Sequence, residues 1–150
     1  MAEIKSEEIK PGLVVYLDTD TLRKAGGSKT NAENANGQDR AVQGPHQFLV
    51  LEVDEEANSC LAVPLFSNPA NGNVMLQRAK MAGSTPQWKA GTYHYSRWQH
   101  WEIPLDKLVL ASEGELSVEG DRCTYAADDS AELNTISAWK KKNRAPWRDL

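Results

Sequence analysis

The apolar and polar positions along the chain mostly follow the pattern of short β-strands separated by turns. Gly12–Asp18 (GLVVYLD) is a β-branched and aromatic run that follows a Pro-Gly turn. His46–Asp54 (HQFLVLEVD) and Ser59–Phe66 (SCLAVPLF) are apolar runs of strand length, and the short, mainly polar segment Glu55–Asn58 separates them. The pattern therefore predicts a β-hairpin over residues 46–66, preceded by one further strand.

A long polar segment, Thr19–Gln43, connects the first strand to this hairpin. It is rich in Gly, Asn, Ser and charged residues and poor in large apolar ones. Connections of this length without secondary structure are uncommon in compact domains, and those that occur are commonly functional or disordered. We therefore expect residues 19–43 to form a long polar loop.

The second half of the chain has weaker patterns. Asn68–Asn73 (NPANGN) is a dense turn signal, and Val74–Lys80 is expected to be a further strand. Ile103–Ser112 (IPLDKLVLAS) fits either a strand or a short helical turn followed by a strand. Leu116–Tyr125 (LSVEGDRCTY) has the pattern of a second hairpin around a Gly-Asp turn.

The last element, Asp128–Asn143, has the pattern of a helix. Its first residues can cap a helix start, and its lysines complement the dipole of the last turn. An approximate apolar stripe runs through Ala131, Leu133, Ile136 and Trp139. Residues 1–150 are therefore predicted to form a single, mainly β domain, a small half-open β-barrel with a C-terminal basic helix and tail over residues 128–150.

The composition is that of a globular protein and limits the cellular compartment that we expect. The 150 residues are 40% hydrophobic and 25% charged, and no apolar run approaches the roughly 18 residues that span a bilayer. The charged N-terminal segment lacks the apolar region of a secretory signal. Cys60 and Cys123 are too few and too far apart for a disulfide framework or a metal site. We therefore expect a cytoplasmic protein with no membrane contact, no cofactor and no metal.

The net charge of −4 conceals an asymmetry. Residues 138–149 hold one acidic residue, Asp149, and five basic ones: Lys140, Lys141, Lys142, Arg144 and Arg148. The remainder carries 12 basic and 20 acidic residues, a balance of −8. Nucleic acid would therefore have to bind locally, through the tail or a cleft. The basic tail suits nucleic acid or an acidic protein partner, and equally the solvated end of a helix.

Thr92–Trp101 (TYHYSRWQHW) concentrates aromatic and titratable side chains. An extended chain would place both histidines and Trp98 on one side, whereas a helix would place His94, Arg97, Trp98 and Trp101 on one face. Such side chains suit acid–base catalysis or the stacking of nucleobases. The candidate substrate-binding residues are therefore His94, Arg97, Trp98, His100 and Trp101. The alternative is that the tryptophans anchor the core and the histidines satisfy local hydrogen bonds. Two histidines six residues apart, without a third ligand, do not predict a metal site.

The order of motifs from Lys10 to Pro69 carries a resemblance to a known family. KPGLVVYLD, a long polar connection, GPHQFLVLEV, a turn and CLAVPLFSNP resemble the N-terminal half of the MazF/PemK endoribonucleases of type II toxin–antitoxin systems. The resemblance implies an SH3-like β-barrel, usually a homodimer, that cuts single-stranded RNA without a metal. It also implies an antitoxin protein as a partner. The C-terminal half of the chain lies outside the resemblance.

The resemblance implies catalytic positions at the start of the second strand and the end of the third. Ser67 stands where the family keeps a hydroxyl residue, and His46 lies near the family's basic residue. Family members usually carry an arginine there, whereas the nearest arginine here is Arg40. In this interpretation His46 transfers protons, Ser67 donates to the phosphate, Arg40 neutralises it and the polar loop gates the channel. The alternative is a non-catalytic SH3-like barrel that binds a protein or nucleic acid through its aromatic surface and basic tail.

Overall fold

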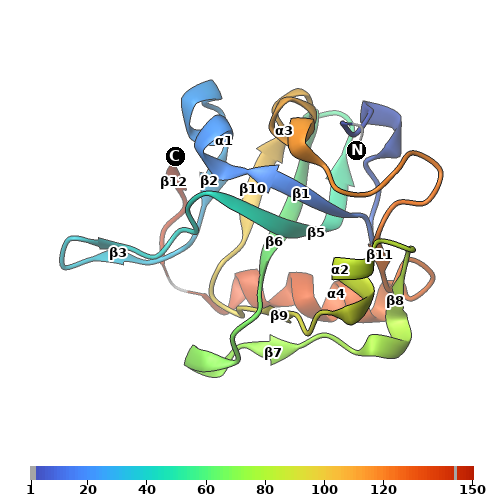
Figure 1. The fold of residues 1–150 in the computed structure, drawn as a ribbon. Coiled ribbons are helices and arrows are strands. Elements are labelled where there is room, and N and C mark those ends of the chain that lie inside the picture. The colour runs from blue at the N-terminus through green and yellow to red at the C-terminus, as the bar shows by residue number, and fades with distance from the viewer. Residues whose placement is uncertain (1–2, 144) are drawn as a thin grey trace.

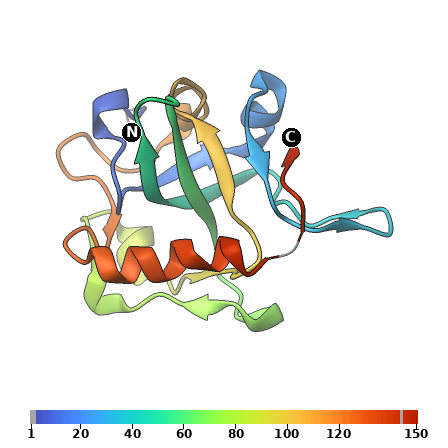
Figure 2. The same ribbon diagram turned by 180° about the vertical axis from the view of Figure 1, so that it is seen from behind.

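The computed structural model describes residues 3–143 and 145–150 and centres on an antiparallel β-sheet (Figures 1 and 2). Its main path of strands is β1 (Val14–Asp18), β5 (Pro45–Asp54), β6 (Ser59–Phe66), β10 (Trp101–Pro104), β2 (Lys29–Thr30) and β12 (Arg148–Asp149). Every neighbouring pair in this path is antiparallel. Two short strands lie off this path. β9 (His94–Tyr95) pairs with the end of β6 and also with β7 (Val74–Met75).

The predicted hairpin is confirmed as β5 and β6, and the predicted first strand is confirmed as β1. In the β5–β6 ladder Phe48 lies opposite Pro64 and Val50 opposite Ala62, with an irregularity between Val50 and Glu52. An extra residue of this kind bends a strand and increases its twist. The hairpin therefore carries the end of β6 to the same edge of the molecule as the start of β5.

Both faces of the sheet are covered, which explains why its central strands are almost continuously apolar. On one face Val15, Leu17, Phe48 and Val50 pack in a core with residues of α1 (Thr19–Ala25) and α3 (Leu105–Ala111). On the other face the core contains Val14, Leu49, Leu51, Val63, Trp88, Leu133 and Ile136. Successive residues of one strand thus enter opposite cores, as the two-residue period of a strand requires.

The predicted C-terminal helix is present but shorter than expected. It comprises α4 (Ser130–Ala138) and the 3-10 turn η5 (Trp139–Lys141), and in Figure 2 it runs crosswise below β6 and β10. Asp129 caps it, since its carboxylate accepts a hydrogen bond from the Glu132 amide at 3.2 Å. Leu133 and Ile136 are buried, whereas Ala131 of the predicted stripe is exposed. Arg144 of the basic tail lies outside the described residues.

The expectation that Thr19–Gln43 is one long polar loop is wrong. The segment contains α1, β2 and a hairpin of β3 (Asn34–Ala35) and β4 (Gln38–Asp39), which projects from the body in Figure 1. Asn36 and Gly37 at its tip have φ of 54° and 75°, values that suit an Asn-Gly hairpin turn. The segment looks like a loop in the sequence because α1 buries only Thr19 and Leu22, and the hairpin strands are exposed on both faces.

Three predictions in the second half are also wrong in detail. Residues 103–112 begin in β10 and continue as α3, so they form neither one strand nor a helical turn followed by a strand. Residues 116–125 do not pair with each other beyond a single bridge from Val118 to Asp121, because β11 (Thr124–Tyr125) pairs instead with β8 (Met81–Ala82). The expected strand over Val74–Lys80 is limited to β7. The remaining short helices are η1 (Ser6–Glu8), η2 (Ala70–Gly72), η3 (Arg78–Lys80), α2 (Pro86–Ala90) and η4 (Ser112–Gly114).

The fold is mixed α/β, with a mainly antiparallel sheet and short helices. The described residues form no closed barrel, because β1 and β12 end the main path of the sheet without pairing with each other. Within the described ranges no helix combines the length and the apolar character that crossing a membrane requires.

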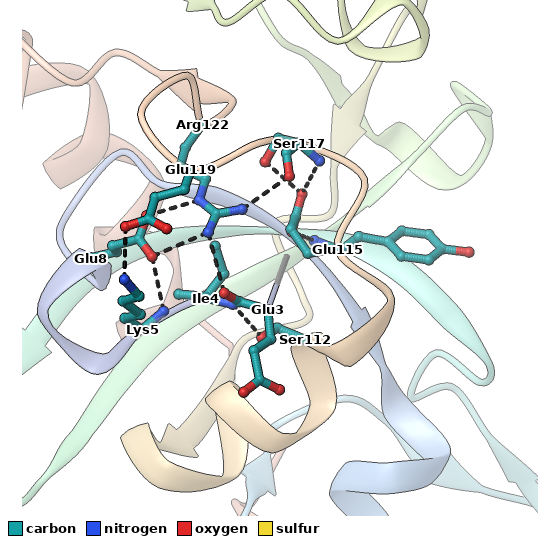
Figure 3. A network of polar contacts seen from close by, with 10 residues as sticks. Glu3, Ile4, Lys5, Glu8, Ser112, Glu115, Ser117, Glu119 and Arg122 are labelled. Atoms are coloured by element: carbon teal, nitrogen blue, oxygen red, sulfur yellow. Dashed lines mark hydrogen bonds and ion pairs between the residues drawn. The ribbon is translucent and has the colours of Figure 1, made fainter. Parts of the chain in front are cut away.

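A polar network ties the N-terminal segment to the loop before β11 (Figure 3). The Arg122 guanidinium donates to both carboxylate oxygens of Glu8, at 2.8 and 3.2 Å, and to the Ser117 carbonyl at 3.0 Å. The buried carboxylate of Glu115 accepts from the Tyr16 amide and from the amide and hydroxyl of Ser117. We call this group the Arg122 network, and the hydrogen bond from Arg122 holds the pKa of Glu8 below its ordinary value.

Candidate functional site

The start of β5 and the end of β6 lie side by side, as the resemblance implies. The imidazole of His46 packs edge-on against the Phe66 ring, with 6.0 Å between the ring centroids, and its Nδ1 lies 3.4 Å from the Leu65 carbonyl oxygen. His46 is half-buried, and Ser67 follows β6 as an exposed residue. The antiparallel ladder therefore brings these two predicted catalytic residues to the same end of the β5–β6 pair.

Arg40 lies at the base of the β3–β4 hairpin, and a buried glutamine holds its backbone. The Gln99 side chain donates from Nε2 to the Arg40 carbonyl at 3.0 Å. Its Oε1 accepts from the Val42 amide and from the Trp101 indole, at 3.0 and 2.9 Å. The Arg40 guanidinium is exposed and forms no ion pair with any residue that the structure describes. Gln99 thus fixes the backbone of Arg40, whose exposed side chain keeps its charge available.

A surface pocket of about 410 Å³ joins the hairpin base to the end of β6. We call it the Arg40 pocket, and its lining residues are Ala32, Glu33, Arg40, Phe66, Asn68, Ala70, Asn73, Ser96, Trp98 and Gln99. Its volume lies in the range of about 300–1,000 Å³ that is usual for ligand pockets. Arg40 and Trp98 therefore reach one pocket, whereas His46 and Ser67 lie next to it and do not line it.

Trp98 is the most exposed tryptophan of the predicted site, with 47% of its surface accessible. Its ring packs edge-on against Trp139 of η5, with centroids 5.7 Å apart. The same Trp139 ring is contacted by the Arg97 guanidinium at 5.0 Å and by the Lys142 ammonium at 4.7 Å. We call these four residues the Trp98 cluster. Neither of its cations forms an ion pair within the described part of the chain.

The other predicted substrate-binding residues are buried, which is a correction to the sequence analysis. Trp101 is fully buried, packs against Phe48 at 5.3 Å between centroids and belongs to the core. His94 is buried in β9, and its Nδ1 lies 3.3 Å from the Phe66 carbonyl oxygen. His100 is fully buried, and burial lowers its pKa below the ordinary value. These three side chains are therefore not accessible to a ligand at the surface.

Strand pairing explains that burial. The run Thr92–Trp101 is neither one strand nor a helix, because β9 ends at Tyr95 and β10 begins at Trp101. The intervening turn breaks the alternation, so Arg97 and Trp98 reach the surface while Gln99 and His100 point inward. His100 Nε2 lies 3.1 Å from the Ile136 carbonyl oxygen and thereby connects this turn to α4.

The two cysteines belong to the cores and do not line the Arg40 pocket. Both cysteines are free and buried, and burial raises the pKa of the Cys60 thiol to about 12, which keeps it protonated. Among residues 3–143 and 145–150, no three His, Cys, Asp or Glu side chains are grouped closely enough to hold a metal ion.

Sequence reasoning missed the residues that complete the pocket. In the sequence, Phe66 and Asn68 are marked only as the end of a strand and the start of a turn, and Gln99 stands between aromatic neighbours. The only sequence signal for Gln99 is that an uncharged amide stands in an otherwise aromatic and basic run. No family model matches the chain, and comparisons with curated proteins and with solved structures likewise found no match.

Proposed function

We propose that the protein binds single-stranded RNA at the Arg40 pocket and cleaves it as a metal-independent endoribonuclease of MazF/PemK type. The observation that carries the proposal is the exposed Trp98 at a pocket wall, next to cations that no described carboxylate neutralises. In an acidic protein such unpaired cations create a local site for phosphate. Aromatic rings with neighbouring cations are the usual elements of single-strand recognition.

The binding step assigns one role to each element of the pocket. A base stacks on the exposed part of the Trp98 indole, and the adjoining phosphate accepts hydrogen bonds from the Arg40 guanidinium. Gln99 fixes the Arg40 backbone, so little ordering of the main chain accompanies binding. The Asn68 and Ser96 side chains line the same pocket and supply polar contacts to the base or ribose.

The chemical step takes place at the edge of the pocket, where His46 packs against Phe66. A base removes the proton of the ribose 2′-hydroxyl, whose oxygen attacks the adjacent phosphorus. The bond from phosphorus to the 5′-oxygen breaks, and an acid protonates that oxygen to leave a 2′,3′-cyclic phosphate. His46 serves in proton transfer, Ser67 donates to a non-bridging oxygen and Arg40 stabilises the charge of the pentavalent intermediate.

The proposal has a second form, in which the same surface binds RNA or a protein partner without cutting. One observation favours it, namely that His46 and Ser67 adjoin the Arg40 pocket without lining it. The SH3-like half-open barrel, the homodimer and the antitoxin partner implied by the resemblance belong to the first form of the proposal. So does the cytoplasmic location.

The test incubates the purified protein with 5′-labelled single-stranded RNA in EDTA. We expect shorter products that end in a 2′,3′-cyclic phosphate. Arg40→Ala, His46→Ala and Ser67→Ala should each slow their formation by about 10-fold or more. Arg78→Ala removes an exposed arginine outside the pocket and is the matched control, with its unfolding free energy measured because Arg78 also donates to the Lys89 and Gly91 carbonyls.

Each other outcome selects between the two forms. RNA that is bound but stays intact would establish the non-catalytic form. RNA that is neither bound nor cut would end the nucleic-acid proposal altogether.

A further inference from the structure

A second surface pocket, of about 590 Å³, lies next to the Arg40 pocket. The two share Ala32, Glu33 and Trp98, so Trp98 stands as a ridge between them. The far wall of the second pocket comes from the C-terminal segment, through Asn143, Pro146 and Arg148. We call it the tail pocket. The resemblance does not reach this part of the chain.

Hydrogen bonds hold the walls of the tail pocket in place. Asn143 donates from Nδ2 to the Trp98 carbonyl at 2.8 Å and to the Asn31 carbonyl at 3.1 Å. Arg148 donates to the Asp39 carboxylate at 2.5 Å and to the Ala32 carbonyl at 3.2 Å, and β12 pairs with β2. Segments that are more than 100 residues apart thus form one preformed surface around Trp98.

The lining of the tail pocket suits a nucleobase. The Trp98 indole, Pro146 and alanine side chains provide apolar surface, and Asn34 provides an exposed amide side chain at its edge. The charge of Arg148 is already neutralised by Asp39. Among the described residues, Arg97 and Lys142 carry free positive charge close to the ridge, and both are held on Trp139. A base with its phosphate matches this combination of flat apolar surface and neighbouring cations.

We propose that the tail pocket is a second nucleotide subsite and that one strand of RNA crosses Trp98 from one pocket to the other. This inference rests on the proposed function, since it extends the site at the Arg40 pocket. The Trp98 indole then separates two neighbouring nucleotides and contacts both. The chain therefore recognises a strand of at least two nucleotides, and the C-terminal segment supplies the affinity for the second one.

The test compares a mononucleotide with a tetranucleotide. Both probes are 2′-O-methylated, which removes the nucleophilic hydroxyl and prevents cleavage. The wild-type protein should bind the tetranucleotide at least about fivefold more tightly, the lower limit expected for one additional stacked base. Ala145→Glu places a carboxylate in the tail pocket, and it should abolish most of this gain while changing mononucleotide affinity less than twofold. Ala131→Glu makes the same change on the exposed side of α4 and should leave both affinities as in the wild type.

Backbone amide chemical shifts give a second readout that needs no variant. Both probes should shift Arg40 and Ser96, and only the tetranucleotide should shift Asn143 and Ala145. Equal affinities for the two probes, or equal effects of Ala145→Glu and Ala131→Glu, would overturn the second subsite and leave the proposed function standing. Failure of both probes to bind would overturn the inference together with the proposed function.

Discussion

The Arg122 network and the Trp98 cluster treat positive charge in opposite ways. The Arg122 side chain is 7% exposed and is held by the Glu8 carboxylate and by backbone carbonyls. Arg97 and Lys142 rest on the face of Trp139, and Arg40 ends in solvent, with no ion pair to any of them among the described residues. In the Arg122 network the carboxylate neutralises the charge of the arginine, whereas the cations near Trp98 keep their charge available to a ligand.

This difference separates a structural role from a binding role. A buried cation that loses its carboxylate is costly, so the Arg122 network is expected to contribute to stability. An exposed cation beside an aromatic ring contributes little to folding, and its charge remains free for a phosphate. Substitutions in the Arg122 network should therefore lower the free energy of unfolding, whereas substitutions in the Trp98 cluster should weaken RNA binding.

The largest effect on stability is expected for Arg122→Ala. The substitution removes charge-assisted hydrogen bonds and leaves the partly buried Glu8 carboxylate without its partner. We expect the free energy of unfolding to fall by about 2–3 kcal/mol. Urea unfolding followed by tryptophan fluorescence measures it. A loss below about 0.5 kcal/mol would remove the contrast between the two regions.

Next in size is the loss of RNA affinity in Trp98→Ala, expected to be about tenfold because one stacking surface disappears. Trp147→Ala is the matched control, since Trp147 is 37% exposed and lines neither pocket. Titration with a fluorescent single-stranded oligonucleotide measures both variants. Equal losses of RNA affinity in the two variants would show that binding does not depend on Trp98 in particular.

A smaller effect is expected from pH, through His100. Burial lowers the pKa of His100 in the folded state, so the unfolded chain binds a proton first as the pH falls below about 6.5. The protein should therefore lose unfolding free energy between pH 7 and pH 5.5, by no more than about 1.4 kcal/mol per pH unit for one proton. His100→Asn should abolish this dependence of the unfolding free energy on pH, even if the substitution changes the unfolding free energy at pH 7. Carboxylates with lowered pKa values, such as Glu8, lose their contribution only at lower pH.

The smallest effect is expected for Lys5→Ala at the margin of the Arg122 network. Lys5 pairs with Glu119 at 2.8 Å, but both side chains are more than half exposed. Water and salt screen such pairs, so the urea midpoint should stay the same. A clear shift would mean that the exposed part of the network contributes as much as its buried centre.

The sequence predicted the elements whose pattern is local. The β5–β6 hairpin followed from two apolar runs and a short connection, and α4 from its capping and apolar residues. α1 was missed because its only deeply buried apolar side chain is Leu22. The order of strand and helix over Ile103–Ser112 was missed because a short apolar run fits a strand and a buried helix equally well.

The candidate site was predictable only in part, since its geometry depends on contacts between distant segments. His46 and Ser67 come together through strand pairing, which the hairpin pattern already implied. Arg40, in contrast, is positioned by Gln99, 59 residues further along the chain. The burial of His100 and Trp101 depends on a turn that shifts the alternation of side chains, and nothing in Thr92–Trp101 marks that turn.

The salt dependence of RNA binding by the wild type and Arg40→Ala tests most directly whether the unpaired cations serve a phosphate backbone. Each phosphate contact on a single strand contributes a slope of about −0.7 in log affinity against log salt concentration. We predict that Arg40→Ala binds more weakly, has a slope shallower by about 0.7 and keeps the unfolding free energy of the wild type. An unchanged slope, or a fall in stability that accounts for the lost binding, would contradict the account.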